Sequence, residues 1–444
     1  MGIGVSLATP IKLKSLQRAL YSKAKREPQT RFHFLYDKVW RNDVLKHAYA
    51  RNRSNGGAPG VDGQTFAAIE AYGVGRWLAE LQEELRNETY KPKAVRRVMI
   101  PKPSGVGERP LGIPTIRDRV VQMAVKLVTE PIFEADFDEA AYGYRPRRSA
   151  EQAVRRVHEA LWQNHTEVID ADLSRYIDMI LHEPLMKSVA RRNSDAKVLH
   201  LIKMWLKAPV EETDDKGRRR ITGGKRSKRG TPQGGVLSPT LANLYMHRFI
   251  KAFRKFGLDK EHGAVLVNYA DDLVVLCRRD AGGALAKIRS WFVKIGLEIN
   301  ESKTSVKHAR KESFDFLGYT FKLLRSYKTG ALYPGAVPAD KAVKRLKRSI
   351  RSWLFRTNLN PIEHVVEHLN RMLRGWANYF RYGSVLRVRL KLDRFIYDRV
   401  RYFLARRAKS RTRGNRRYPW LHVFGELGVI SLGTLPRVGR ECLL

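Results

Sequence analysis

The sequence predicts an α+β fold in which β-hairpins and helical segments occupy different parts of the chain. Residues 95–114 and 264–277 each contain two runs of β-forming residues separated by a turn. Residues 339–376 instead carry apolar side chains at helical spacing among many Lys and Arg residues. With 444 residues, 43% of them hydrophobic, the chain is long enough for two or three domains with ordinary hydrophobic cores.

The charge balance indicates a polyanionic partner. The chain has 85 Lys and Arg residues against 44 Asp and Glu residues, a formal net charge of +41. Nucleic acid fits better than a membrane, because 18 Tyr, 17 Phe and 8 Trp residues are dispersed among the basic ones and no segment approaches the length of a bilayer span. Cys277 and Cys442 are the two cysteines, so neither a disulfide framework nor a zinc cluster is expected. No secretory signal is visible, and we expect a cytoplasmic protein.

The N-terminal region precedes the first predicted strand. It contains basic, helix-prone segments at residues 12–26 and 32–47, followed by a glycine-rich turn at residues 52–63. We interpret residues 1–92 as an N-terminal extension that leads into the first β-rich domain.

Residues 95–114 predict a β-hairpin with a tight turn at residues 103–107. Arg96, Lys102 and Arg109 lie on this hairpin. Such cations can meet the oxygens of a triphosphate, while the glycines of the turn permit close approach. A solvated basic hairpin without a ligand explains the same residues equally well.

A strand that ends in acidic residues follows two helical segments. Residues 116–137 have a helical pattern, and Ser149 with Gln152 forms a capping box that begins the next helix. The strand after it carries Asp170 and Asp172, which alternation places on the same face. Asp172, at the strand end, is the better candidate to meet a second acidic segment, and Asp170 is the alternative.

A glycine-rich turn at residues 230–235 follows the basic stretch 216–229 and precedes a helix over residues 241–256. Such turns often serve only to reverse the chain. Gln233 lies between a proline and a glycine, so we expect it to be held rigidly with its amide free to touch a base or a sugar.

Two adjacent carboxylates, Asp271 and Asp272, interrupt the apolar run at residues 264–277. Bare carboxylates beside a buried hairpin are costly unless a positive charge meets them, and no Lys or Arg lies within the run. Taken alone, the dipeptide is better interpreted as a solvated turn. Hard oxygen ligands suit Mg²⁺, however, and two Mg²⁺ ions roughly 4 Å apart need carboxylates from separate segments, which Asp172 would complete. This pattern points to phosphoryl transfer at a nucleic-acid end.

With Asp172, Gln233 and the YADD segment in this order, the chain resembles the bacterial group II intron-encoded reverse transcriptases. The resemblance extends over about 330 residues in ordered blocks. The blocks are residues 56–63, the IPKP to RPLGIPT hairpin, AYGYRPRRSAEQA, the acidic strand, GTPQGGVLSP, YADD, and residues 296–304 and 314–319. Residues 369–380 resemble the maturase segment, which serves as the polymerase thumb in that family.

The resemblance implies a right-hand polymerase with fingers, an antiparallel palm sheet and an α-helical thumb or maturase domain. The implied division is an N-terminal extension and the start of the fingers at residues 1–92, fingers and palm at 93–330, the thumb at 331–405, and a basic nucleic-acid-binding segment at 406–444. Some members carry a Cys/His endonuclease module after the thumb. The residues after 417 provide neither the length nor the ligands for it, so we expect none.

The same resemblance assigns roles to individual residues. Asp172, Asp271 and Asp272 take the catalytic, metal-binding positions. The implied nucleotide-binding residues are Arg96 over the templating base, Lys102 and Arg109 at the triphosphate, Gln233 beside the nucleotide, and Lys303 near the leaving pyrophosphate. Ile177 departs from the family, because this position is usually aromatic and excludes a 2′-hydroxyl. A smaller side chain predicts weaker discrimination against ribonucleotides, unless a backbone shift or Tyr176 fills the same volume.

The implied activity is RNA-directed DNA synthesis with two Mg²⁺ ions, for which Mn²⁺ is a possible substitute. The implied partners are an RNA template, intron RNA, a DNA primer or target, and dNTPs, within a cytoplasmic ribonucleoprotein that assists splicing and retrohoming. A non-enzymatic splicing factor and a domesticated reverse transcriptase with a host role such as defence are the alternatives. The first is less consistent with the sequence, because all three acidic residues are present. A metal-dependent nuclease lacks a candidate His or further acidic cluster.

Overall fold

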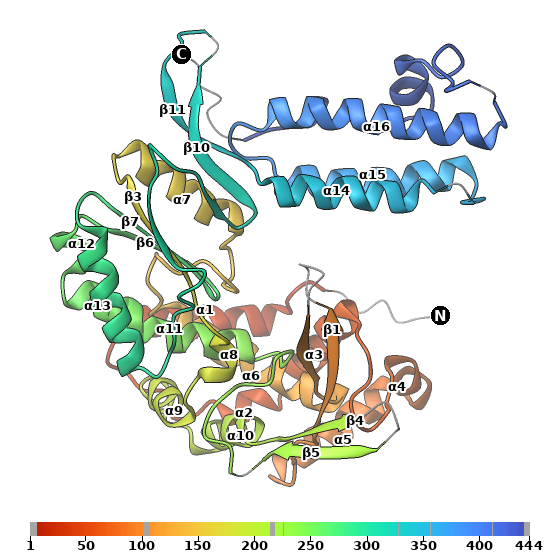
Figure 1. Cartoon of the computed structure of the whole chain (residues 1–444). Coiled ribbons are helices and arrows are strands. Elements are labelled where there is room, and N and C mark those ends of the chain that lie inside the picture. Colours follow the sequence, from red (N-terminus) through yellow and green to blue (C-terminus); the bar gives the residue numbers. More distant parts are fainter. Residues whose placement is uncertain are drawn as a thin grey trace.

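The computed structural model describes residues 7–101, 107–213, 218–224, 226–326, 328–355, 357–410 and 412–438, and Lys102 and Cys442 lie outside them. Helices and strands alternate in groups along the chain, so the predicted α+β class is confirmed. Buried apolar residues form three clusters. In Figure 1 the helices α14–α16 lie apart from β1 and α3, and the sheet with β3, β6 and β7 lies to the left of both groups.

The N-terminal helices share one hydrophobic core with the residues that follow them. Buried side chains from both sides of residue 93, such as Leu13, Leu45 and Val121, belong to the same cluster, and α1 and α3 pack against α6. The helices of this region are α1 Ile11–Arg26, α2 Tyr36–Val39, α3 Asn42–Asn55, α4 Phe66–Tyr72, α5 Val74–Arg86 and α6 Ile116–Glu134. The residues expected to be an N-terminal extension therefore share their core with the residues that follow.

The fingers sheet has the strand order β2-β1-β4-β5. The predicted hairpin at residues 95–114 is confirmed as an antiparallel pair, whereas β1 pairs with β4 in parallel. The strands are β1 Val95–Pro101, β2 Glu108–Ile113, β4 Pro209–Thr213 and β5 Arg219–Gly223.

The palm sheet has the strand order β6-β7-β3-β8, and every pair in it is antiparallel, as predicted. Its strands are β3 Glu167–Asp172, β6 Val265–Tyr269, β7 Asp272–Cys277 and β8 Ser305–His308. Because side chains alternate along a strand, Ile169 and Val275 bury into one cluster while Val168 and Val274 bury into another. The sheet is therefore covered on both faces.

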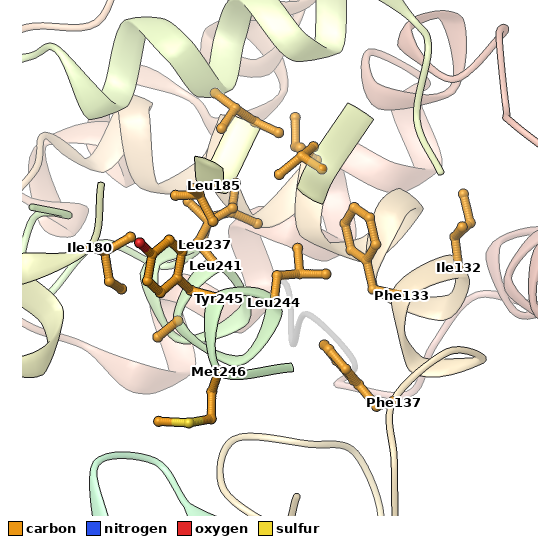
Figure 2. Close-up of a cluster of buried hydrophobic side chains, with 14 of the residues drawn as sticks. Ile132, Phe133, Phe137, Ile180, Leu185, Leu237, Leu241, Leu244, Tyr245 and Met246 are labelled. Atoms are coloured by element: carbon orange, nitrogen blue, oxygen red, sulfur yellow. The ribbon is translucent and has the colours of Figure 1, made fainter. Parts of the chain in front are cut away.

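Helix α11 Ser238–Lys255 lies at the centre of the larger cluster. Figure 2 shows Leu241, Leu244 and Tyr245 of α11 among side chains from α6 and α9. The remaining helices around the palm are α7 Ala150–Trp162, α8 Tyr176–Met179, α9 His182–Ala190, α10 Ala196–Leu206, α12 Leu258–Glu261 and α13 Ala281–Lys294. The predicted capping box is present, because Ser149 accepts a hydrogen bond from the Gln152 backbone and Gln152 accepts one from the Ser149 backbone.

A third sheet joins the palm to the thumb. Its strand order is β11-β10-β9, with β9 Phe314–Phe316, β10 Tyr319–Arg325 and β11 Leu332–Pro338. The thumb contains α14 Asp340–Trp353, α15 Ile362–Tyr379 and α16 Leu386–Arg407, followed by a π-helical turn η1 His422–Glu426 and a 3₁₀ turn η2 Leu432–Thr434. The expected boundary at residue 330 falls inside the β10–β11 hairpin.

The last described residues pack into the thumb. Val423, Val429 and Leu432 are buried in the same cluster as Leu369 and Ile396. The segment expected to be a basic nucleic-acid-binding segment, residues 406–444, thus contributes side chains to the thumb core. Across the described residues, no helix combines the length and apolar character needed to cross a bilayer.

Candidate active site

The three predicted acidic residues lie at adjoining ends of β3 and β7. β3 ends at Asp172 and β7 begins at Asp272, and the strand register places these two residues directly opposite each other. Opposed residues of an antiparallel pair point to the same face of a sheet. Asp271 precedes Asp272 at the β6–β7 turn. The fold thus brings together carboxylates that are about a hundred positions apart in the sequence.

The β6–β7 turn is held by contacts on two sides. Ala270 has a φ of 59°, a left-handed conformation that costs energy for an L-residue. The Asn268 side-chain nitrogen Nδ2 donates to the backbone oxygens of Ala270 at 2.9 Å and Asp272 at 3.2 Å. Gly143 packs so closely that a Cβ atom there would lie 2.4 Å from the Ala270 nitrogen, and Asn243 Nδ2 donates to the Gly143 oxygen at 2.7 Å. The position of the acidic pair therefore depends on the turn around Gly143.

Negative charge is concentrated and only partly balanced at this site. Water reaches the Asp272 side chain, yet its pKa is raised to about 7, mainly by desolvation and then by the carboxylates of Asp271, Asp172 and Asp170. Lys303 Nζ donates to Asp172 Oδ2 at 2.9 Å, and this hydrogen bond raises the pKa of Lys303. One ammonium group thus faces several carboxylates, which favours the approach of a further cation.

Asp170 belongs to a neighbouring charge cluster. Burial raises its pKa to about 6, Lys307 opposes that shift, and Asp315 adds to it. Lys307 Nζ lies 3.9 Å from Asp170 Oδ2. In the sheet, Asp170 lies opposite Val274, further along β7 than Asp272. Asp172 is therefore the β3 carboxylate that lies beside the acidic pair.

The donor chemistry of this site fits Mg²⁺, because all three side chains offer carboxylate oxygens and Lys303 balances only part of their charge. Among the described residues, no three His, Cys, Asp or Glu side chains are arranged to hold a metal ion as they stand. Asp172 is instead engaged by Lys303.

Two of the three predicted fingers cations are described. Arg96 lies on β1 opposite Ile113, and Arg109 lies on β2 opposite Ile100. The third, Lys102, lies outside the described residues. Arg109 is exposed, whereas the Arg96 side chain is half-buried. The structure thus places Arg109 where it can meet a ligand from solvent.

The loop that carries Gln233 is hydrogen-bonded to Ile177. The Thr231 backbone nitrogen donates to the Ile177 oxygen at 3.1 Å, and Ile177 is half-buried against the larger apolar cluster. The Gln233 amide was expected to be free, and it is not. Its nitrogen Nε2 donates to both carboxylate oxygens of Asp178, at 3.0 and 3.1 Å.

Three further residues lie near these groups, and the sequence did not indicate them as site residues. Asp178 follows Ile177 directly. The backbone nitrogen of Asn300 donates to the backbone oxygen of Asp172 at 2.8 Å. Tyr144 has a φ of 56° and is 51% exposed. The pKa of Tyr144 is raised, mainly by burial and then by Asp271, while Arg109 opposes the shift, so Tyr144 lies within electrostatic reach of both. The AYGYR motif was the one available signal for Tyr144, since a positive φ is not visible in a sequence.

Carboxylates that attract cations, set near cationic β-strands, suit the transfer of a phosphoryl group from a nucleotide. The strongly basic thumb adds a surface for a polyanion. The fold and the site together therefore define a nucleotidyltransferase that acts on nucleic acid.

Comparisons with known proteins agree with this class. Residues 100–321 match the model of the reverse transcriptase (RNA-dependent DNA polymerase) family, and residues 343–420 match the maturase-specific domain of group II introns. Protein YkfC of Escherichia coli is 31% identical over 392 residues, which cover 78% of this chain and 98% of that protein. The group II intron-encoded protein LtrA of Lactococcus lactis is 32% identical over 224 residues, which cover 50% of this chain and 35% of LtrA.

Among solved structures, telomerase from Candida albicans in complex with a fragment of telomeric RNA has a TM-score of 0.41 and 14% identity, covering 81% of this chain and 65% of that chain. This similarity is too weak to carry an argument. The family matches and YkfC suffice: the chain belongs to the reverse transcriptases of the group II intron-encoded type. It is an RNA-directed DNA polymerase with a maturase domain.

Proposed function

We propose that Asp172, Asp271 and Asp272 hold two Mg²⁺ ions with which the protein extends a DNA primer on an RNA template. The observation that carries this proposal is the opposition of Asp172 and Asp272 across β3 and β7 beside Asp271. The pKa of Asp272, raised by desolvation and then by the neighbouring carboxylates, supports it. Bound Mg²⁺ would activate the primer 3′-hydroxyl and neutralise charge on the phosphates.

The protein's own residues would position the reactants. The β6–β7 turn fixes the acidic pair, and Arg109 on β2 supplies a cation for the triphosphate. Following the family motif, we assign Lys102 to the same role and Arg96 to the contact that covers the templating base. Lys303 forms an ion pair with Asp172. Following the family motif, we assign its ammonium group the role of donating a proton to the leaving pyrophosphate.

The thumb would bind RNA. One face of α14 is buried through Leu346 and Ile350, and its other face is basic. The exposed or half-buried cations of α14 are Lys341, Lys344, Arg345, Lys347, Arg348 and Arg351. We propose that this surface holds intron RNA, so that the protein assists splicing and retrohoming within a cytoplasmic ribonucleoprotein.

Exchange of one carboxylate for an amide separates polymerisation from RNA binding. Asp271→Asn removes one ligand charge and leaves the thumb untouched, so extension should fall by at least about a hundredfold while the Kd for RNA stays within about twofold. Asp37→Asn, at an exposed Asp far from the palm sheet in sequence, is the matched control. Primer extension and RNA binding are measured on the same preparations. Wild-type extension rates in Asp271→Asn would remove Asp271 from the metal site.

A further inference from the structure

A cavity of about 390 Å³ lies between the palm and the sheet that joins the palm to the thumb. Its walls come from the end of α7, the turn after β8 and both strands of the β10–β11 hairpin, and Figure 1 shows α7 beneath this hairpin. Thr166, which lines the cavity, precedes β3, whereas Asp172 ends that strand. About 20 Å of strand therefore separates the cavity from the acidic site.

One wall of the cavity is aromatic. Trp162 is 47% exposed, and its ring lies at 17° to that of Tyr333 on β11, with the centroids 6.4 Å apart. The His158 ring packs edge-on against the indole, at 6.3 Å between centroids. His158 is itself fixed, because Nε2 donates to the Pro334 oxygen at 2.8 Å and Nδ1 lies 2.9 Å from the Tyr382 hydroxyl. The indole is thus held in place with about half of its surface open to solvent, as a platform for stacking requires.

Two exposed cations line the same cavity, Arg310 in the turn after β8 and Lys322 on β10. Arg310 Nη2 donates to Asn164 Oδ1 at 2.9 Å. A guanidinium group has five N–H donors, so others remain for a ligand. None of the described residues that line the cavity is acidic. The cavity therefore favours an anion next to its aromatic wall.

A ligand that carries both a flat ring and a negative charge would use both features of this cavity. Phosphate alone would leave the indole without a partner, and an uncharged aromatic compound would leave the cations without one. A nucleotide carries a phosphate and a base, and any base can stack on an aromatic side chain. The base must be unpaired, because in a duplex its faces are covered by neighbouring bases. The volume of the cavity falls within the range of about 300–1,000 Å³ that small-ligand sites occupy.

We propose that this cavity binds one unpaired nucleotide of a single-stranded nucleic acid, with the base on Trp162 and the phosphate at Arg310 and Lys322. This binding uses none of the palm carboxylates, so it is independent of the proposed catalysis. It gives the protein a contact with a single strand at the end of the palm sheet opposite the acidic site.

The test measures, by fluorescence anisotropy, how the full-length protein binds a labelled tetranucleotide while a saturating RNA–DNA duplex occupies the polymerase site. Trp162→Leu removes the aromatic ring, so the Kd should rise about tenfold, the effect of losing one stacked base. A tetranucleotide of abasic units, which keeps the phosphates, should bind both proteins equally. Phe256→Leu, at another exposed aromatic residue, should leave the Kd within about twofold. Ribose and deoxyribose versions of the tetranucleotide show whether an RNA or a DNA strand is the source, and binding of either supports the site.

A second variant keeps the indole and removes the positive charge. Arg310→Gln combined with Lys322→Gln should reduce the slope of log Kd against log salt concentration by about 1.4, the value for two phosphate contacts on a single strand. A tetranucleotide with 5-iodouracil should crosslink on irradiation to residues 157–175, the tryptic peptide that contains Trp162. The crosslink should weaken in the double variant, although its indole is intact.

The charge control is Lys46→Gln combined with Lys294→Gln, which removes two exposed lysines from other helices and should leave the crosslink unchanged. If Trp162→Leu does not fold, the double variant of the cavity decides, because both of its positions are exposed. The proposal is overturned if the abasic strand binds as tightly as the normal one, if Trp162→Leu and Phe256→Leu behave alike, or if the crosslink lies outside residues 157–175. Each of these results would mean only a general attraction to a basic surface.

Discussion

Gly143 supports the turn that carries the acidic pair, so Gly143→Ala should displace that turn. The added Cβ would lie 2.4 Å from the Ala270 nitrogen and 3.1 Å from the Tyr269 carbonyl carbon. Ordinary contacts of a Cβ begin near 3.4 Å, so the backbone must move by about 1 Å. A 1 Å misplacement of a catalytic group costs about a hundredfold in rate. The overpacking itself should cost about 1–3 kcal/mol of stability.

The assay for Gly143→Ala is single-turnover primer extension on an RNA template with saturating dNTP. Gly75→Ala is the matched control, because a Cβ at Gly75 in α5 meets no atom within 4 Å. We expect extension by Gly143→Ala to fall about a hundredfold while RNA binding stays unchanged, and Gly75→Ala to behave as the wild type. Extension by Gly143→Ala at the wild-type rate would refute the argument that this contact sets the position of the acidic pair.

Three further predictions concern His247, Arg389 and Ile177. The pKa of His247 is lowered to about 4, mainly by burial. Because the unfolded chain binds this proton from about pH 6.5 downward, the free energy of unfolding should fall by about 2 kcal/mol between pH 6.5 and pH 5. Thermal melts of His247→Leu should lack this part of the fall. Arg389 is fully buried and donates to backbone oxygens of α15 and of the last described residues. Arg389→Met should therefore lower the free energy of unfolding, measured by urea denaturation, by about 3–5 kcal/mol, whereas Arg387→Met, at an exposed position, should not. Ile177→Phe should lower the ratio of rNTP to dNTP kcat/KM if Ile177 limits the space at the sugar, and an unchanged ratio would show that it does not.

The palm hairpin could be predicted from the sequence because its signals are local. Apolar β-formers on both sides of Asp271 and Asp272 define two strands, and a buried sheet leaves little choice of register. The strand ending at Asp172 has the same pattern. Once both strands join one antiparallel sheet, their acidic ends must meet, and the strand pairing agrees with that expectation.

The side-chain partners within the site could not be predicted. Asp172 and Lys303 are separated by 131 positions, and Gln233 and Asp178 by 55. Such pairs depend on how turns and loops are placed in space, and a sequence pattern carries no signal for it. The expectation of a free Gln233 amide was wrong for this reason, since rigidity was inferred from flanking residues and the partner came from another element.

The burial of charged residues in the thumb could not be predicted from the sequence either. Arg389 is 0% exposed, and the Arg401 side chain is only 12% exposed. A sequence assigns charged residues to the surface because burial of an unpaired charge is costly. Arg389 avoids that cost by donating to several backbone oxygens, an arrangement that depends on where the last described residues pack.

The most direct measurement is template-dictated addition of one nucleotide to a DNA primer annealed to RNA, with each dNTP offered separately in Mg²⁺. We predict that the purified protein adds the complementary dNTP at least about a hundredfold faster than the other three, and that EDTA abolishes addition while added Mg²⁺ restores it. Addition that ignores the template base, or that persists in EDTA, would contradict a polymerase built on Asp172, Asp271 and Asp272.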